Sequence, residues 1–524
     1  MGTTEGIRGG RLVSGRFADA DGVLGSGTPE AELVARVLAA APPGTREVVA
    51  HLRAQGIPPG ALAVIGPLLR AELVGDAEWD EAVAADRERL CRLDRAAELA
   101  AATLEPYAGD VALLAPALSR MWSSDVDVLV RRGAPPAIGA ALRASGCIAL
   151  DDLLDRIGRG APDVDRYAVV DGTEVLGALE LCRRAYDDGP HAEPLIARAE
   201  PAPGAAIGSV VPADLLRRRA GKAVAARRMS VRSVLELRAL SSLADGSGDA
   251  PLVRAALARA AEVERSLGVA PTAPESGEAR PWTDRSWVRA RARSAGREAR
   301  RALRPRGVQV VFSGIDGAGK STQVQRLSDN LLRVNITRTT AWVRLGFTGS
   351  PLLSLSARFG QRVLPDTSHS AHVARSTGTG EETPITRRGI VGWSWALAVT
   401  GDFIRAARKA VRHAHGSVGI FDRALLDAEI ALDHDYGGAL DLGFHHRLLR
   451  RLMRHPDTTF YLRIPGEIAY DRKEDMFSRD VLVGMVARYD AFMADRAGVV
   501  IVDAQDPPDR IALTVLRRLA GEPA

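Results

Sequence analysis

The sequence predicts an α/β fold for the C-terminal part of the chain, on three observations. Residues 314–322 read Gly-Ile-Asp-Gly-Ala-Gly-Lys-Ser-Thr and fit the phosphate-binding P-loop pattern G-x-x-x-x-G-K-[ST]. An apolar run, Val308–Phe312, leads into this loop, and an amphipathic stretch with Val324, Leu327 and Leu331 follows it. From this run onward, strand and helix patterns alternate, which is typical of a parallel sheet flanked by helices.

A strand, a glycine-rich loop and a helix N-terminus together direct backbone N–H groups at a polyphosphate. We therefore expect an ATP site whose binding residues are Gly314, Asp316, Gly317, Ala318, Gly319, Lys320, Ser321 and Thr322. Lys320 is expected to reach the β- and γ-phosphates, and the Ser321 hydroxyl to hold Mg²⁺. Only four of the 70 basic residues are lysines, so lysine at position 320 stands out in an arginine-rich chain.

Further strands of this domain are expected at residues 339–343, 416–421, 458–462 and 498–502. The third strand of the domain ends in Asp422-Arg423. A carboxylate at this strand end suits the Mg²⁺ shell, and the arginine suits an incoming phosphate. The alternative is an ion pair at a strand end, which the nearby P-loop disfavours. A polar insert at residues 366–388 is expected to be a mobile or disordered loop on the substrate side.

The chain is expected to consist of four regions. Residues 1–28 are glycine-rich and are expected to be disordered, residues 29–243 to form a helix-rich α+β domain, 244–306 a linker, and 307–524 the P-loop domain. Helical patterns cover residues 31–39, 81–99, 136–145 and 251–266, and a strand pattern covers 126–130. The arginine-dense helix at 285–306 favours a solvated basic face over nucleic-acid contact, because no aromatic residues are interleaved.

Composition narrows the class of protein. The 524 residues carry a net charge of +5 and have 46% hydrophobic residues, so nucleic acid is an unlikely partner and ordinary cores are expected. Three widely spaced cysteines indicate a reducing compartment. No apolar stretch reaches the roughly 18 residues of a membrane span, and no signal peptide is recognised. We therefore expect a cytoplasmic protein with no membrane partner.

Residues 307–519 resemble the thymidylate kinases, a family of P-loop nucleoside monophosphate kinases. The resemblance rests on the loop at 313–323, on Asp422-Arg423, on His455-Pro-Asp-Thr-Thr-Phe-Tyr-Leu462 and on Val499-Val-Ile-Val-Asp503. It implies an ATP- and Mg²⁺-dependent phosphotransferase with a parallel sheet flanked by helices. It also implies a small-molecule phosphate acceptor and makes a homodimer plausible.

The same resemblance implies roles for individual residues. Asp316 would meet the acceptor's sugar hydroxyl, and Arg344 and Arg423 its phosphate. Members with a small residue at the position of Ala318 supply their catalytic cation from a lid. Together with Lys320, Asp422 and Arg423, the lid residues that would act in catalysis are Arg472, Lys473 and Arg479.

The chain departs from the family after Asp422-Arg423. Ala424, Asp427 and Asp433 stand at positions that help to hold the nucleoside in the family. Thymine recognition is therefore not expected. Carboxylates near the acceptor, Asp433 and Asp435 among them, would instead suit a polyhydroxylated or amine-bearing metabolite.

A second acidic pattern lies in the N-terminal half. Asp125 and Asp127 alternate on one strand, so both carboxylates lie on one face and are able to hold a divalent metal. The surrounding residues 96–182 resemble the Asp-x-Asp strand region of nucleotidyltransferase-like proteins. A third carboxylate is open between Asp165, Asp171 and Glu180. The alternative is a strand with a solvated acidic edge.

Three functions are consistent with these patterns. The first is a kinase centred on the P-loop, which we favour. The second is an ATP-binding regulatory or scaffold module in which both sites are inactive. The third is a nucleotidyltransferase that uses Asp125 and Asp127.

Overall fold

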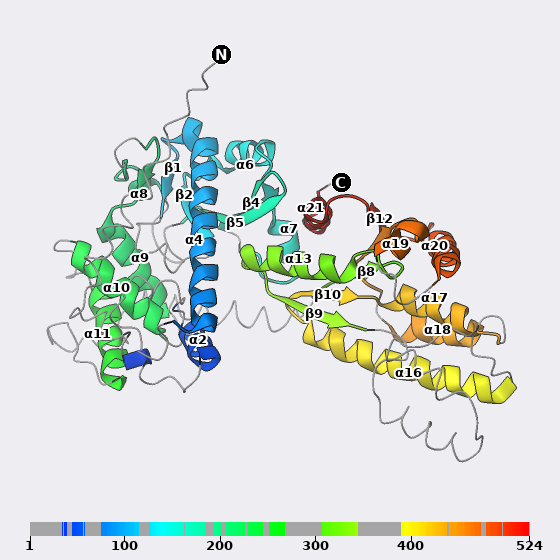
Figure 1. Ribbon diagram of the computed structural model, residues 1–524. Coiled ribbons are helices and arrows are strands. Elements are labelled where there is room, and N and C mark those ends of the chain that lie inside the picture. Colours follow the sequence, from blue (N-terminus) through cyan, green and yellow to red (C-terminus); the bar gives the residue numbers. More distant parts are fainter. Residues whose placement is uncertain are drawn as a thin grey trace. The chain divides into compact units, whose positions relative to one another are not determined.

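The chain forms two compact units, which we describe separately (Figure 1). The first comprises Met1–Asp151 and Ala161–Ala302, the second Asp152–Gly160 and Leu303–Ala524. The computed structural model describes residues 34, 36–38, 45–55, 57, 75–114, 125–161, 163–184, 192–201, 205–225, 229–244, 251–267, 307–343, 389–436, 440–453, 455–472, 478–494 and 496–522. The expectations for residues 1–28, for the arginine-rich helix at 285–306 and for the insert at 366–388 lie outside these residues.

The first unit contains a mixed sheet in the order β3-β4-β5-β2-β1-β7-β6. Its strands are β1 (Val111–Leu113), β2 (Asp125–Val130), β3 (Ile148–Ala149), β4 (Val164–Asp171), β5 (Glu174–Cys182), β6 (Glu200–Pro201) and β7 (Gly208–Ser209). Strands β4 and β5 form an antiparallel hairpin whose two-residue turn begins with Gly172, at a φ of +59° that suits glycine. Strand β2 runs parallel to β5, and this pairing positions the acidic residues considered below.

Helices cover both faces of this sheet. They are α2 (Thr45–Ala54), α4 (Ala77–Leu104), η5 (Glu105–Tyr107), α6 (Pro135–Ala144), α8 (Glu193–Ile196), α9 (Pro212–Ala225), α10 (Val231–Leu243) and α11 (Pro251–Ser266). The long helix α4 begins at Asp76, whose side chain accepts a hydrogen bond from the Trp79 N–H at 3.0 Å.

Two hydrophobic cores follow from the alternation of side chains along the strands. Val126, Val128 and Val130 of β2 belong to a core shared with α4 and α6. Leu129 and Cys182 on the opposite face belong to a second core, which contains residues of α9, α10 and α11. The face of β2 that carries Asp125 and Asp127 is therefore the face on the side of α9.

The second unit is built on a five-stranded sheet in the order β12-β11-β8-β10-β9, and all of its neighbouring strands are parallel. The strands are β8 (Val308–Ser313), β9 (Arg338–Trp342), β10 (Val418–Asp422), β11 (Thr458–Arg463) and β12 (Val499–Asp503). Every residue of the central strand β8 is buried, as expected for a parallel strand covered on both faces. The expected parallel α/β sheet is thus confirmed, with all five strands overlapping the segments identified from sequence.

The second unit also contains helices. They are α7 (Asp151–Arg156), α13 (Lys320–Arg333), α16 (Gly389–His413), α17 (Leu425–Tyr436), α18 (Gly443–Leu452), α19 (Gly466–Arg472), α20 (Arg479–Met493) and α21 (Pro508–Leu519). Helices α13 and α21 pack together, while Phe403 of α16 and Leu449 of α18 join a core with Val311 and Phe421 of the sheet. Among the described residues, no helix is long and apolar enough to cross a bilayer.

Candidate functional site

The loop between β8 and α13 needs glycine at two positions for steric reasons. Gly314 and Gly317 have φ angles of +141° and +85°. A Cβ atom would lie 2.7 Å from the Leu462 carbonyl oxygen at the first position and 2.6 Å from that of Ala469 at the second. At Gly319, with a φ of +84°, nothing lies within 4 Å of such a Cβ. The loop is therefore packed on one side and leaves room at Gly319 for a close-approaching group.

Helix α13 begins directly after this open position. Its N-cap residue is Gly319, which has no side chain to cap the first turn. The N–H groups there, which have no partner within the helix, are consequently available to a phosphate.

Lys320 is buried inside the loop. Its Nζ donates hydrogen bonds to the carbonyl oxygens of Gly314 at 2.9 Å and Ile315 at 2.7 Å, and lies 3.7 Å from Asp316 Oδ1. Burial and the nearby Arg423 charge lower the pKa of Lys320 to about 8, against the opposing effect of Asp316. An added anion would therefore stabilise the charged form of Lys320, which this environment disfavours.

Asp422 and Ser321 form the part of the site that suits a metal ion. Ser321 Oγ donates to Asp422 Oδ2 at 2.7 Å. The other carboxylate oxygen, Oδ1, is buried and has no hydrogen-bond partner among the described residues. A buried acceptor of this kind is destabilising unless something pairs with it, and a hydroxyl beside a carboxylate is a ligand set that Mg²⁺ accepts.

Arg423 completes the cluster with an unusual backbone. Its φ is +71°, in the left-handed region that non-glycine residues rarely adopt. Its guanidinium forms an ion pair with Asp316. Although burial opposes the charge, Asp316 and the surrounding carboxylates raise the pKa of Arg423 above its usual value. Local strain of this type concentrates at functional sites because the surroundings must enforce it.

Asp427 corrects an expectation from sequence. It is buried, and its carboxylate accepts hydrogen bonds from Ser313 Oγ, from the Ala424 N–H at 3.2 Å and from the Tyr489 hydroxyl at 2.9 Å. It therefore connects the end of β8 to α20 and is not available to hold an acceptor.

The other residues predicted for the acceptor site and the lid make separate contacts or lie outside the described residues. Asp433 lies 3.3 Å from His446 Nε2, and the side chain of Asp435 lies outside the described residues. Arg472 donates to the Ala504 carbonyl oxygen at 3.1 Å, and Arg479 lies 4.0 Å from Asp471. Arg344 and Lys473 lie outside the described residues. Of the predicted residues, the structure thus brings together Asp316, Lys320, Ser321, Asp422 and Arg423.

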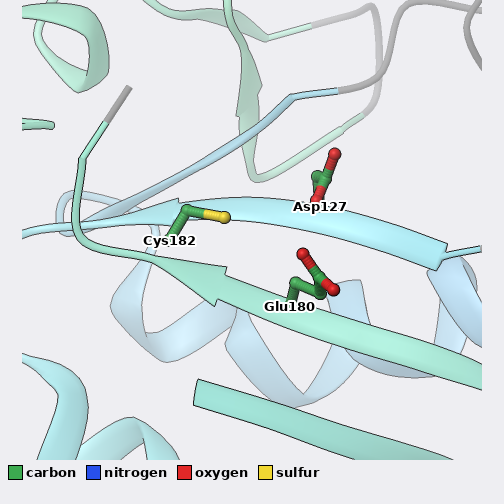
Figure 2. A group of neighbouring side chains, drawn as sticks. All are labelled: Asp127, Glu180 and Cys182. Atoms are coloured by element: carbon green, nitrogen blue, oxygen red, sulfur yellow. The ribbon is translucent and has the colours of Figure 1, made fainter. Parts of the chain in front are cut away.

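The first unit contains a separate acidic cluster. In the register of β2 and β5, Asp127 stands opposite Glu180, and Cys182 follows on the same face (Figure 2). One carboxylate oxygen of each acid and the Cys182 sulfur all lie within 4.8 Å of one another. Of the three carboxylates left open by the sequence, Glu180 is the one beside Asp127. Asp165 and Asp171 form ion pairs with Arg183 and Arg95.

Protonation in this cluster reflects its low exposure. Burial and the Asp125 carboxylate raise the pKa of Glu180 to about 7, against the opposing charge of Arg166. Burial raises the pKa of the Cys182 thiol to about 12, so this thiol is protonated at neutral pH. Burial would also raise the pKa of Asp127, but Arg218 and Lys222 hold it below its usual value.

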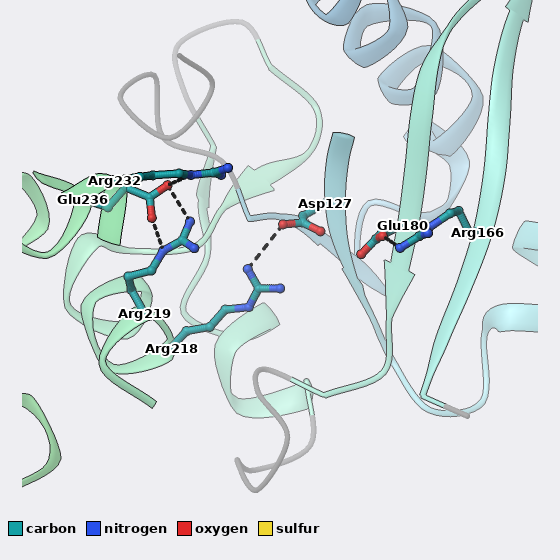
Figure 3. A network of polar contacts seen from close by, with 7 residues as sticks. All are labelled: Asp127, Arg166, Glu180, Arg218, Arg219, Arg232 and Glu236. Carbon is teal, nitrogen blue, oxygen red and sulfur yellow. Dashed lines mark hydrogen bonds and ion pairs between the residues drawn. The ribbon is translucent and has the colours of Figure 1, made fainter. Parts of the chain in front are cut away.

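Two arginines that the sequence did not single out contact these acids (Figure 3). Arg218 of α9 lies with its Nη1 3.4 Å from Asp127 Oδ2, and Arg166 of β4 forms an ion pair with Glu180. The neighbouring Arg219 pairs with Glu236 of α10 at 2.8 Å instead. The run Arg217-Arg218-Arg219 was visible in the sequence, but nothing local linked it to β2.

Comparison with models of known protein families and with curated proteins found no match.

Proposed function

We propose that the second unit is an ATP- and Mg²⁺-dependent phosphotransferase of the thymidylate kinase-like, nucleoside monophosphate kinase type. Its acceptor would be a nucleotide or a related small anionic or sugar metabolite. The observation that carries the proposal is the buried Asp422 Oδ1, which has no hydrogen-bond partner among the described residues and lies beside Ser321 and the P-loop. A cation bridging this carboxylate to a phosphate would satisfy it.

The position of these residues in the sheet also supports a phosphotransferase site. Strand β8 lies between β10 and β11. The chain passes from β8 to β9 and β10 on one side of this strand, and then to β11 and β12 on its other side. Ligands of open α/β sheets bind outside the carboxyl ends of the strands at such a switch point. The P-loop and Asp422-Arg423 follow the carboxyl ends of two adjacent strands, β8 and β10.

Each clustered residue then has a role. Ser321 and Asp422 would hold Mg²⁺, which when bound neutralises charge on the β- and γ-phosphates. Lys320 would exchange its carbonyl partners for phosphate oxygens. The first-turn N–H groups of α13 would bind the phosphates as a fixed set of donors. Arg423, oriented by Asp316, would grip the anionic part of the acceptor or of the transferred group.

The proposal is tested with γ-phosphate-labelled ATP, Mg²⁺ and a panel of nucleoside monophosphates, sugars and sugar phosphates. We expect transfer of label to at least one acceptor class. Tight ATP binding without transfer to any acceptor or to water would contradict the proposal and favour a regulatory module. Incorporation of label from the α-phosphate would instead indicate nucleotidyl transfer, and its loss in Asp127→Asn would assign that activity to the first unit.

A further inference from the structure

The acidic cluster of the first unit has the spacing of a metal site but not its charge. Asp127, Glu180 and Cys182 present ligand atoms within 4.8 Å of one another, close enough for one ion. Metal-dependent nucleotidyl transfer needs carboxylates that are free to bind the cation. In this structure, the carboxylates of Asp127 and Glu180 are already neutralised by other cations.

Two guanidinium groups neutralise the carboxylates of this cluster. Arg218 Nη1 lies 3.4 Å from Asp127 Oδ2, and the side chains are only 9% and 20% exposed. Arg166 pairs with Glu180, with exposures of 22% and 15%. Each acidic ligand of the cluster thus has a fixed positive partner from a neighbouring element of the fold. A divalent ion placed among them would face like charges at short range in a poorly solvated region.

Arg218 is not free to swing away, because α9 is firmly held. Leu215, Leu216 and Ala220 of this helix are buried in the core shared with the sheet. Arg219 on the next position pairs with the buried Glu236 of α10. Withdrawing Arg218 while the helix stays packed would leave a guanidinium in a largely buried position without its carboxylate.

We propose that Arg218 is the built-in cation of this site and takes the place of a divalent metal. The Asp-x-Asp strand of the first unit, which resembles that of nucleotidyltransferase-like proteins in sequence, is accordingly neutralised without a metal. The ion pair between Asp127 and Arg218 serves instead to join β2 to α9. This inference is independent of the function proposed for the second unit.

The test is a titration of the full chain with Mn²⁺ alone, followed by electron paramagnetic resonance of the free ion. Sites elsewhere, including the P-loop, cancel when variants are compared. We expect the wild-type protein, Asp127→Asn and Glu180→Gln to bind the same number of ions. Arg218→Met should bind one more, because it frees Asp127 and leaves a single guanidinium, that of Arg166, beside the two carboxylates. That additional ion should be lost in Arg218→Met/Asp127→Asn.

The matched control is Arg219→Met, which removes an equally basic neighbour that pairs with Glu236, and it should gain no ion. If wild-type protein binds one ion more than both Asp127→Asn and Glu180→Gln, the site is a metal site and the proposal is wrong. A folded Arg218→Met that gains no ion would also overturn it. Should Arg218→Met fail to fold, the comparison of wild type with the two carboxylate variants still decides the question.

Discussion

The two polar clusters of the molecule differ in what they leave unsatisfied. Around the P-loop, Asp422 Oδ1 is buried without a partner among the described residues, and Arg423 has a strained backbone. In the first unit, Asp127 and Glu180 are each paired with a guanidinium. Both clusters bring carboxylates and cations together from strands, loops and helices. We infer that an unpaired buried carboxylate oxygen beside a strained backbone indicates a missing ligand, whereas carboxylates that are already paired with guanidinium groups indicate a structural role.

The largest effect on activity is expected at Lys320. We expect Lys320→Ala to lower kcat by at least about 10²–10³-fold, because a buried charge aimed at the phosphates is removed. The matched control is Lys409→Ala, since Lys409 is exposed on α16, and it should leave turnover unchanged. Steady-state phosphoryl transfer measures both. Wild-type turnover in Lys320→Ala would remove the P-loop from the reaction.

The structural role of the other cluster predicts a large effect on stability. Asp127→Asn should lower the free energy of unfolding by about 3 kcal/mol, toward the lower end for breaking a buried ion pair, because the amide oxygen still accepts a hydrogen bond. Adding Arg218→Met should recover part of this loss. Phosphoryl transfer should be unchanged. Urea unfolding and kinase assays measure the two effects.

An exposed ion pair provides the control for this prediction. Asp110 pairs with Arg131 at 3.0 Å, and their side chains are 40% and 52% exposed. Asp110→Asn should change stability by no more than about 1 kcal/mol. If Asp127→Asn is as stable as Asp110→Asn, the ion pair between Asp127 and Arg218 does not stabilise the packing of β2 against α9.

The sheet of the second unit was predictable from sequence because its signals are local. Most of its strands are short apolar runs, although β9 is not, and the P-loop spacing is a contiguous pattern. The first unit was less predictable. Only the strand at β2 was identified there, although the hairpin of β4 and β5 carries an Asp171-Gly172 turn signal. The other strands of its sheet include pairs such as β6 and β7, only two residues long, which leave almost no periodic pattern.

Site residues were predictable where they lie in one contiguous pattern and not where pairing between distant segments selects them. The P-loop glycines are identified by their spacing, although the atoms that exclude a Cβ at Gly314 and Gly317 belong to Leu462 and Ala469, outside the loop. Glu180 could not be chosen over Asp165 because the choice depends on the register of β2 against β5. Asp427 was misplaced for a similar reason. Its burial depends on Tyr489, which comes from α20, far along the chain.

The acceptor site of the second unit is expected to disfavour thymidine nucleotides. We expect dTMP to be a poor acceptor, with kcat/KM below about 10⁴ M⁻¹s⁻¹. Ala424 offers no polar group to a base, and the Asp427 carboxylate is engaged by Ser313 and Tyr489. A competition assay against the best acceptor of the panel measures it. Efficient use of dTMP would make the protein a thymidylate kinase in activity.

A variant distinguishes a structural role of Asp427 from a role in acceptor binding. Asp427→Ala removes the side chain that accepts from the Tyr489 and Ser313 hydroxyls, so activity should fall by about 10- to 100-fold with every acceptor. If the variant instead gained activity on dTMP alone, Asp427 would face the acceptor as the sequence predicted.

The smallest expected effect concerns pH and the charge of Lys320. Burial and Arg423 lower its pKa to about 8 without nucleotide, so the ammonium is lost as pH rises through this value. Phosphates bind the charged form, and above about pH 8 ATP binding must therefore take up a proton. Affinity should fall by at most about tenfold per pH unit in that range and stay nearly constant below it.

Calorimetric titration with ATP from about pH 7 to about pH 9.5, in two buffers of different ionisation enthalpy, measures affinity and proton uptake together. Lys320→Arg is the matched variant, because arginine stays charged throughout this range. It should bind ATP with an affinity that does not fall with pH and without proton uptake. In the first unit no such dependence is expected for ATP, since its cluster takes no part in binding it. Constant affinity and no proton uptake in the wild-type protein would mean that Lys320 keeps its charge, and that the carbonyls and Asp316 around it outweigh burial.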